Sequence, residues 1–220
     1  MLDNPNLIAT CLIGDGEAET GPTATAWHLN KFIDPKINGA VLPILHLNGY
    51  KISGPTIFGR MSNKELKNLF SGYGYEPHIV EGNNIYEKMV TTMERAYQSI
   101  KDIQDHARRG GKVERPKFPM IILKTPKGWT GIKKLKGQKI EGNCLAHQVV
   151  GANTKTDKVE LSAVNKWLAS YKFSELFSDG AGFVDEIKGL IPSEDLRMGD
   201  NRHTMGGNKA MKELILPAAE

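Results

Sequence analysis

Apolar runs alternate with amphipathic segments along this chain, and the alternation predicts its secondary structure. Short apolar runs bounded by polar residues or glycine are typical of buried strands, whereas apolar residues three or four positions apart indicate helices. The predicted strands span residues 7–13, 40–47, 76–81 and 119–125. The predicted helices span residues 23–32, 62–71, 85–109, 157–171 and 184–190. Because strands and helices alternate over the first 125 residues, we predict an α/β fold with a parallel sheet and helices on both faces.

Two of the predicted helices carry further signals. Ser62 followed by Glu65 forms a capping box, which marks the start of a helix. The longest helix presents one apolar stripe, made of Ile85, Met89, Met93, Tyr97, Ile100 and Ile103. A stripe of this kind faces a core, so we interpret its methionines as core filling rather than as ligands.

The size and composition of the chain fit one ordinary domain. Its 220 residues, 40% of them hydrophobic and 25% charged, are enough to bury one core and carry a small appendage. No apolar run approaches the roughly 20 residues that span a bilayer, and the first residues lack a signal-peptide pattern. We therefore expect a cytoplasmic protein without membrane association. Cys11, in a predicted buried strand, and Cys144, in a predicted loop, are expected to be free thiols.

The net charge of +4 comes from basic residues that are mostly spread along the chain. One basic cluster, at residues 108–115, ends the longest predicted helix, where cations offset the helix dipole. The other lies around a long loop rich in glycine and lysine, over residues 128–143, and consists of Lys124, Lys127, Lys133, Lys134, Lys136 and Lys139. Its charge could attract a phosphorylated substrate as easily as a nucleic acid. Because no aromatic stacking platform accompanies it, we do not expect nucleic-acid binding.

The strongest chemical signal lies where the first two predicted strands end. Gly14, Asp15 and Gly16 follow the first apolar run, and Asn48 follows the second. Glycines on both sides of a carboxylate let the backbone turn sharply and approach a phosphate closely. Mg²⁺ prefers hard oxygen ligands, such as those of carboxylate and amide groups. Because parallel strands bring their carboxyl ends to one edge of a sheet, these two segments predict a site for a magnesium diphosphate.

Gly-Asp-Gly alone is also what a tight turn after a strand looks like, but with Asn48 at this spacing it resembles the thiamine diphosphate motif. Four segments together resemble the phosphoketolase family, in the family's order and at similar spacings. They are GDGEAETGP at 14–22, LHLNGYKI at 45–52, TPKGWTG at 125–131 and AHQV at 146–149. Four ordered matches are far more specific than one.

The resemblance implies a transketolase-like, thiamine diphosphate-binding fold. Residues 1–196 would form the diphosphate-binding domain, incomplete at its N-terminal side, and residues 197–220 a boundary segment. The implied cofactors are thiamine diphosphate and Mg²⁺, with the metal held by Asp15, Asn48 and the backbone carbonyl of Tyr50. The residues implied to line the cofactor pocket are Gly14, Gly16, Glu17 and His147.

Phosphoketolases cleave xylulose 5-phosphate or fructose 6-phosphate with inorganic phosphate, giving acetyl phosphate, an aldose phosphate and water. The cofactor does the carbon chemistry, while the protein orients it and manages protons, for which histidine is suited near neutral pH. The resemblance implies catalytic roles for His147 and Gln148, and a substrate contact for Lys127. The remaining histidines are expected to be structural or exposed; they are His28, His46, His78, His106 and His203.

The chain departs from the family pattern at two loops and in its length. It has Ser53-Gly54-Pro55-Thr56 where the family usually reads Asn-Pro-Thr, and residues 201–207 differ from the family's usual ending. Family members are several times longer. We therefore expect an upstream segment and a pyrimidine-binding domain to be missing, the full enzyme to be a homodimer, and the chain alone to have little or no turnover.

Three other functions compete with this interpretation. A transketolase would pass the two-carbon unit to an aldose instead of to phosphate, although the TPKGW and His-Gln segments argue against it. A non-catalytic half would bind a diphosphate or a partner protein without turnover. A nucleic-acid binder is the most distant alternative, because the basic residues form no stacking surface.

Overall fold

The computed structural model of the chain describes residues 4–111, 115–178, 182–197 and 199–200. These residues belong to two compact units, Met1–Ser170 and Tyr171–Glu220, which are described separately below. Most of the predicted boundary segment, residues 197–220, lies outside the described residues, as does His203.

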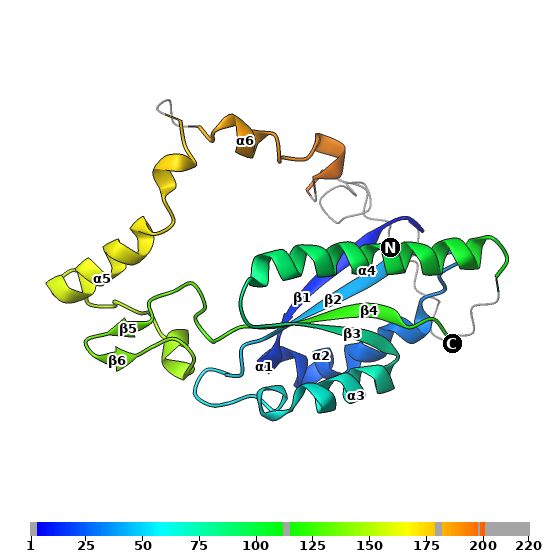
Figure 1. The fold of residues 1–220 in the computed structure, drawn as a ribbon, viewed down its shortest axis with the longest axis horizontal. Coiled ribbons are helices and arrows are strands. Elements are labelled where there is room, and N and C mark those ends of the chain that lie inside the picture. The colour runs from blue at the N-terminus through cyan, green and yellow to red at the C-terminus, as the bar shows by residue number, and fades with distance from the viewer. Residues whose placement is uncertain (1–3, 112–114, 179–181, 198, 201–220) are drawn as a thin grey trace, which may run out of the picture. The chain divides into compact units, whose positions relative to one another are not determined.

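A four-stranded parallel sheet forms the centre of the first unit, with strand order β1-β2-β4-β3 (Figure 1). Its strands are β1 (Ile8–Gly14), β2 (Ala40–Leu47), β3 (Tyr75–Val80) and β4 (Phe118–Lys124). The sequence predicted all four strands to within one residue at each end. Because every neighbouring pair is parallel, all four strands end at the same edge of the sheet.

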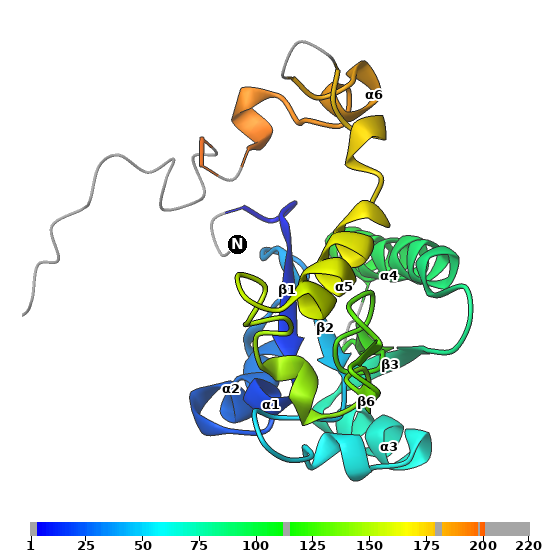
Figure 2. The ribbon, with the colours of Figure 1, turned by 90° about the vertical axis from the view of Figure 1, so that its left-hand side faces the viewer.

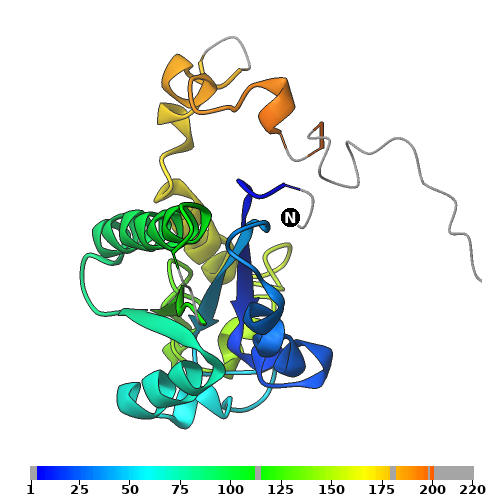
Figure 3. The same cartoon turned by 90° about the vertical axis from the view of Figure 1, so that its right-hand side faces the viewer.

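Helices cover both faces of this sheet, which confirms the predicted α/β class. The helices of the first unit are α1 (Asp15–Ala18), α2 (Gly21–Ala26), α3 (Asn63–Tyr73), α4 (Ile85–Arg108) and α5 (Lys158–Ala169), with the 3-10 helices η1 (Trp27–Phe32), η2 (Phe58–Arg60) and η3 (Cys144–His147). The long helix α4 runs along one face, while α1, α2 and α3 lie on the other (Figures 1 and 3). The two covering layers shield β2 and β4 from water.

The core lies between the sheet and these helices. On the side of α3, aromatic rings pack edge to face, with the ring centroids of Trp27 and Phe70 4.9 Å apart and those of Phe58 and Phe70 5.7 Å apart. The indole of Trp27 donates a hydrogen bond to the carbonyl of Ala18 at 2.9 Å, so its polar atom is satisfied in the interior. This contact fixes the short helix α1, which begins with Asp15, against the core.

The capping signal of α3 is confirmed in detail. The Ser62 hydroxyl accepts a hydrogen bond from the backbone amide of Glu65, and the Glu65 carboxylate accepts one from the amide of Ser62. The amide and the hydroxyl of Ser62 both donate to the Glu65 carboxylate and thereby lower the pKa of that carboxyl group. The stripe of α4 is confirmed except at Tyr97, whose side chain is 56% exposed, while Ile100 is fully buried.

Two predictions about the first strand and the first helix were wrong. Cys11 is exposed, because β1 is an edge strand with β2 as its partner, although its apolar composition is typical of an interior strand. The helix predicted over 23–32 is divided into α2 and η1, and helical structure already starts at Asp15. Extended backbone at Thr20 and a positive φ of +56° at Gly21, the first residue of α2, separate α1 from α2.

The predicted loop over 128–143 contains a small hairpin that the sequence analysis missed. Strands β5 (Lys134–Leu135) and β6 (Gln138–Lys139) are antiparallel and joined by Lys136 and Gly137, which both have positive φ. A two-residue turn of this kind matches the twist of a hairpin. Two-residue strands are too short to give a period in the sequence, so the hairpin left no signal.

The described residues of the second unit form three short helical turns, η4 (Phe173–Glu175), α6 (Asp185–Lys188) and η5 (Glu194–Leu196). The rings of Phe177 and Phe183 stack with centroids 5.1 Å apart next to an antiparallel bridge between the same residues. Helix α6 falls within the predicted 184–190. Among the described residues, no helix combines the length and the apolar character that a membrane span requires.

Candidate functional site

A pocket of about 460 Å³ lies where β1 and β2 end. The residues that line it are Gly14, Asp15, Gly16, Glu17, Asn48, Tyr50, Lys51, Ile52, Lys127 and His147. Every site residue predicted from the sequence is among them except Gln148. Figure 2 looks toward this end of the sheet, with α5 and the β5–β6 segment on the side that faces the viewer. The pocket therefore collects residues from segments that lie more than 100 positions apart in the chain.

Asp15 is the buried anion of this pocket, with 1% of its surface exposed. Its Oδ1 accepts a hydrogen bond from the amide of Gly16 at 3.0 Å. Its Oδ2 accepts two, from the amide of Gly49 at 2.7 Å and the hydroxyl of Thr56 at 2.9 Å. Burying a carboxylate is costly unless it is hydrogen-bonded or paired with a cation, and these three donors meet part of that requirement.

The oxygens of Asn48 and Tyr50 lie in the segment that follows β2. The Asn48 Oδ1 accepts a hydrogen bond from the amide of Tyr50 at 3.1 Å. The carbonyl oxygen of Tyr50 accepts one from the Lys127 ammonium at 3.1 Å. A cationic group thus already contacts one of the three oxygens that the sequence assigned to a metal. This oxygen is accessible to positive charge from the pocket.

These donors suit Mg²⁺, which favours a carboxylate with neutral oxygens and keeps several positions for water and phosphate. In the part of the chain that the structure describes, no group of three or more His, Cys, Asp and Glu side chains comes together. A site for a transition metal with imidazole or thiolate ligands is therefore not formed by those residues.

The two glycines of the Gly-Asp-Gly turn differ in how much space surrounds them. A Cβ atom on Gly16 would lie 3.2 Å from Cγ of Lys51, closer than ordinary van der Waals contact. On Gly14 it would lie 3.5 Å from the Glu17 carboxylate, which is normal contact distance. Close packing therefore requires glycine more strictly at position 16 than at position 14.

A second carboxylate, Glu19, connects α1 to the loop that follows β2, over residues 48–58. Its side chain pairs with the Lys51 ammonium at 2.8 Å and accepts a hydrogen bond from the amide of Phe58 at 3.0 Å. Burial by itself would raise the pKa of Glu19, but its bonds to Lys51, Ile57 and Phe58 outweigh burial and lower it. No pattern in the sequence distinguishes Glu19, because a charged residue at the end of a short helix is usually exposed.

Lys127 and His147 come together through a close backbone approach. Gly128 has φ of +74°, and a Cβ atom there would lie 2.6 Å from Cβ of Ala146. The segment after Lys127 therefore packs directly against the residue before His147. Asn143 caps this second segment by accepting a hydrogen bond from the amide of Leu145 at 2.9 Å. Glycine at position 128 is the sequence feature that permits the contact.

Gln148 lies apart from the other predicted site residues. Its side chain lines a neighbouring pocket of about 390 Å³, whose walls include Trp129, Val149 and Trp167. His147 and Gln148 thus face different pockets although they are adjacent in sequence. The backbone at Gln148 is extended, with φ of −75° and ψ of 162°, so successive side chains diverge.

His46 lies beneath the pocket, on β2. Its Nε2 is 2.8 Å from the Thr125 hydroxyl, which joins the ends of β2 and β4. Burial lowers the pKa of His46; the negative charge of Asp15 opposes this change, and Lys127 adds to it. His46 was expected to be structural or exposed, and it is half-buried and hydrogen-bonded next to the site.

The β5–β6 hairpin is anchored to α5 by charge. The Lys136 ammonium contacts Asp157 and lies 2.8 Å from Oε1 of Glu160, and the Glu160 carboxylate also accepts a hydrogen bond from the amide of Asn153. Lys136 is the first cause of the lowered pKa values of Asp157 and Glu160. These contacts hold the loop between Lys127 and His147 against α5.

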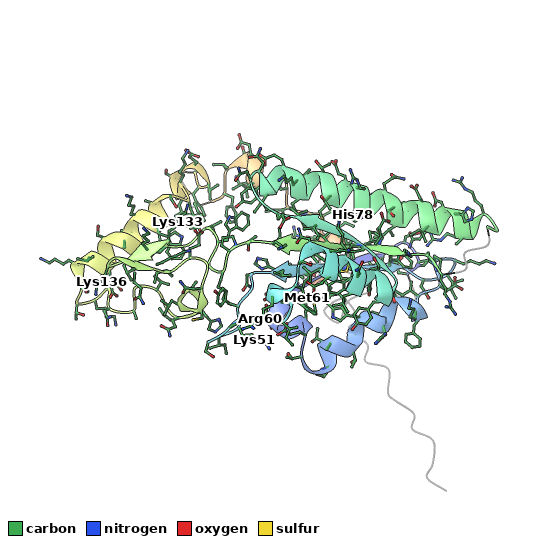
Figure 4. All side chains as sticks on the ribbon, turned by 60° about the horizontal axis from the view of Figure 1, so that its bottom comes forward. Lys51, Arg60, Met61, His78, Lys133 and Lys136 are labelled. Carbon is green, nitrogen blue, oxygen red and sulfur yellow. The ribbon has the colours of Figure 1, made fainter. Side chains whose placement is uncertain are left out.

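We predict that this anchor makes stability depend on pH in the acid range. A carboxylate whose pKa is lowered by folding adds stability above its unfolded pKa and loses it as the pH falls through the folded value. Lys136→Met should therefore lower the melting temperature at pH 7 and have a progressively smaller effect below about pH 4. Lys133, labelled with Lys136 in Figure 4, is an exposed lysine of the same segment, and Lys133→Met is the matched control. If both substitutions lowered the melting temperature equally, or if the effect of Lys136→Met did not change with pH, the ion pairs of Lys136 would not be the source of this stability.

The chain is similar in sequence to a known protein family over nearly its whole length. The chain matches the family model described as the XFP N-terminal domain over residues 1–209. It is 49% identical over 220 residues to a probable phosphoketolase of Bradyrhizobium diazoefficiens, covering 98% of this chain and 27% of that protein. It is 51% identical over 209 residues to a probable phosphoketolase of Synechococcus elongatus, covering 94% of this chain and 26% of that protein. The chain thus spans about a quarter of the length of these relatives.

Proposed function

Because the chain belongs to the phosphoketolase family, as a part of its N-terminal domain, we propose that its pocket binds thiamine diphosphate through Mg²⁺. The observation that carries this proposal is the pocket itself. A buried Asp15 carboxylate, the Asn48 segment and Lys127 meet at the carboxyl ends of β1 and β2. Ligands of open α/β sheets bind at this edge.

Each residue has a role that follows from its position. Asp15, Asn48 and the Tyr50 carbonyl would hold Mg²⁺, as the sequence predicted. Since the ion is shared with a diphosphate, the lining residues Gly14, Gly16 and Glu17 would contact the cofactor. With Mg²⁺ at the Tyr50 carbonyl, the Lys127 ammonium would turn away from it and toward a substrate oxygen or phosphate. Lys127 is suited to this because its ammonium is a compact charge on a flexible stem.

Thiamine diphosphate, when bound, supplies the carbon nucleophile that a ketose cleavage requires. The chain itself must then move protons at the reacting oxygens. His147 is the lining residue suited to take up and return a proton near neutral pH. Gln148 lines the adjoining pocket, so its side chain would have to turn toward His147 to donate a hydrogen bond to the substrate.

The complete protein would convert a ketose phosphate and inorganic phosphate to acetyl phosphate, an aldose phosphate and water. This is a lyase reaction of carbohydrate metabolism, with xylulose 5-phosphate or fructose 6-phosphate as the substrate. We propose that the remaining part of the site comes from segments outside this chain, including a pyrimidine-binding domain, within a homodimer. The proposal follows from the length of the relatives, of which the chain spans about a quarter.

Because the chain spans only about a quarter of the length of its relatives, one competing function is also favoured, in which the chain binds the diphosphate without turnover. An assay of acetyl phosphate separates the two. We expect the complete gene product, given ketose phosphate, inorganic phosphate, thiamine diphosphate and Mg²⁺, to form acetyl phosphate, and the 220-residue chain to form little or none. Offering an aldose phosphate in place of inorganic phosphate tests for transketolase activity. Turnover only with the aldose acceptor would contradict the phosphoketolase reaction, and no turnover by the complete protein would favour the binding function.

A further inference from the structure

The Asp15 carboxylate is held asymmetrically by its surroundings. Its Oδ2 accepts hydrogen bonds from the Gly49 amide and the Thr56 hydroxyl, whereas Oδ1 accepts one from the Gly16 amide. A carboxylate oxygen has about two lone-pair positions for hydrogen bonds. Oδ2 is therefore saturated, and Oδ1 keeps a free position. The oxygen available to a cation is Oδ1.

Thr56 is placed so that its hydroxyl proton points at Asp15. Its side chain is completely buried, and its Oγ1 accepts a hydrogen bond from the Gly59 amide at 3.0 Å. A hydroxyl has one proton to donate. With the Gly59 amide occupying an acceptor position, that proton is directed to Oδ2 of Asp15, 2.9 Å away. The backbone amide of Thr56 also binds the Gly49 carbonyl at 3.0 Å, which fixes both donors of Oδ2 to each other.

Gly59 makes this arrangement possible by leaving space. A Cβ atom on Gly59 would lie 2.6 Å from Cα of Gly49 and 2.8 Å from Oγ1 of Thr56. No larger residue fits there unless the loop moves. The end of the loop is held in place by the bond from the Phe58 amide to Glu19, and its beginning by the pair between Lys51 and Glu19.

We propose that Thr56 is a positioning residue of the metal site, whose hydroxyl holds Oδ2 of Asp15 and leaves Oδ1 available to a cation. This inference rests on the proposed function, since it assigns an orienting partner to the proposed metal ligand. Hydrogen-bond partners of metal ligands contribute substantially to affinity, and their loss typically weakens metal binding about 10- to 100-fold. Thr56 does not line the pocket, so it acts only through Asp15.

The test measures Mn²⁺ binding to the complete gene product at saturating thiamine diphosphate, with free Mn²⁺ followed by electron paramagnetic resonance. Thr56→Val keeps the shape and removes the hydroxyl, whereas Thr56→Ser keeps the hydroxyl and removes a methyl group. We expect Thr56→Val to weaken Mn²⁺ binding about 10- to 100-fold. We expect Thr56→Ser to bind like the wild type, even where its melting temperature without ligands is lower.

Should Thr56→Val fail to fold, the pair Thr56→Ser and Thr56→Ala gives the same comparison, because both lack the methyl group and only one lacks the hydroxyl. A purely structural role for Thr56 predicts affinities that follow the melting temperature, not the hydroxyl. Wild-type affinity in a folded variant without the hydroxyl would overturn the inference. If the wild type itself bound no Mn²⁺ with thiamine diphosphate, the proposed function would fail, and this inference with it.

Discussion

Replacing Asp15 with alanine should abolish Mg²⁺-dependent binding of thiamine diphosphate by the complete gene product. The substitution removes the anionic ligand of the proposed site, together with the acceptor of three hydrogen bonds. We expect the cofactor affinity to fall by more than about 100-fold, because even outer partners of a metal ligand are worth 10- to 100-fold. Isothermal titration of thiamine diphosphate, with and without Mg²⁺, measures this loss directly.

The stability of the protein without ligands must be measured alongside. Asp15→Ala leaves the buried Thr56 hydroxyl and the Gly49 amide without their acceptor, at a cost of about 1–3 kcal/mol for each unsatisfied group. Asp15→Asn keeps the shape of the side chain and removes its charge, so it separates the metal contribution from folding. Asp102→Ala removes an exposed carboxylate of α4 and serves as the control. Cofactor binding that stays Mg²⁺-dependent in folded Asp15→Asn and Asp15→Ala would remove the central assignment of this site.

Replacing His147 with alanine should lower turnover far more than cofactor binding. General acid–base catalysis contributes about 10²- to 10⁴-fold to a rate, and we expect kcat of the complete protein to fall within that range. Loss of one neutral hydrogen bond, about 1.4 kcal/mol, limits the weakening of cofactor binding to about tenfold. Acetyl phosphate formation at saturating substrate measures the first effect, and titration of the cofactor measures the second.

The exposure of His147 offers a second test of its chemical role. Because the side chain is exposed in this chain, added imidazole is expected to restore part of the activity of His147→Ala. His106, also exposed, lies in the last turn of α4 outside the pocket, and His106→Ala should be as active as the wild type. A loss of cofactor affinity as large as the loss of kcat would show instead that His147 holds the cofactor.

The predictions from the sequence agree best with the structure for features that depend on residues close together in the chain. The four strands and the capping box of α3 were predicted from residues that lie only a few positions apart. The lining of the pocket by Asp15 and Asn48 followed from one topological rule, that parallel strands end at the same edge. No knowledge of long-range packing was needed, because the rule applies to any parallel pair.

The disagreements lie where packing partners decide the outcome. The apolar composition of β1 predicted burial of Cys11, but a strand is buried only if other elements cover it, and β1 lies at the edge of the described sheet. Tyr97 has helical spacing within the stripe of α4 and still points to solvent, because the width of the buried stripe depends on what faces it. The local sequence pattern shows neither which elements cover β1 nor which elements face α4.

The local order of residues thus specifies the elements of this protein, the edge of the sheet that carries chemistry, and through Gly14, Asp15, Gly16 and Asn48 the kind of ligand expected there. Tertiary packing specifies how that edge becomes a pocket. The hydroxyl of Thr56 reaches Asp15 across 41 positions of sequence, and Gly128 meets Ala146 only after the loop between them has folded back. Such contacts have no period or fixed spacing, since they depend on the space that remains once helices and strands have packed.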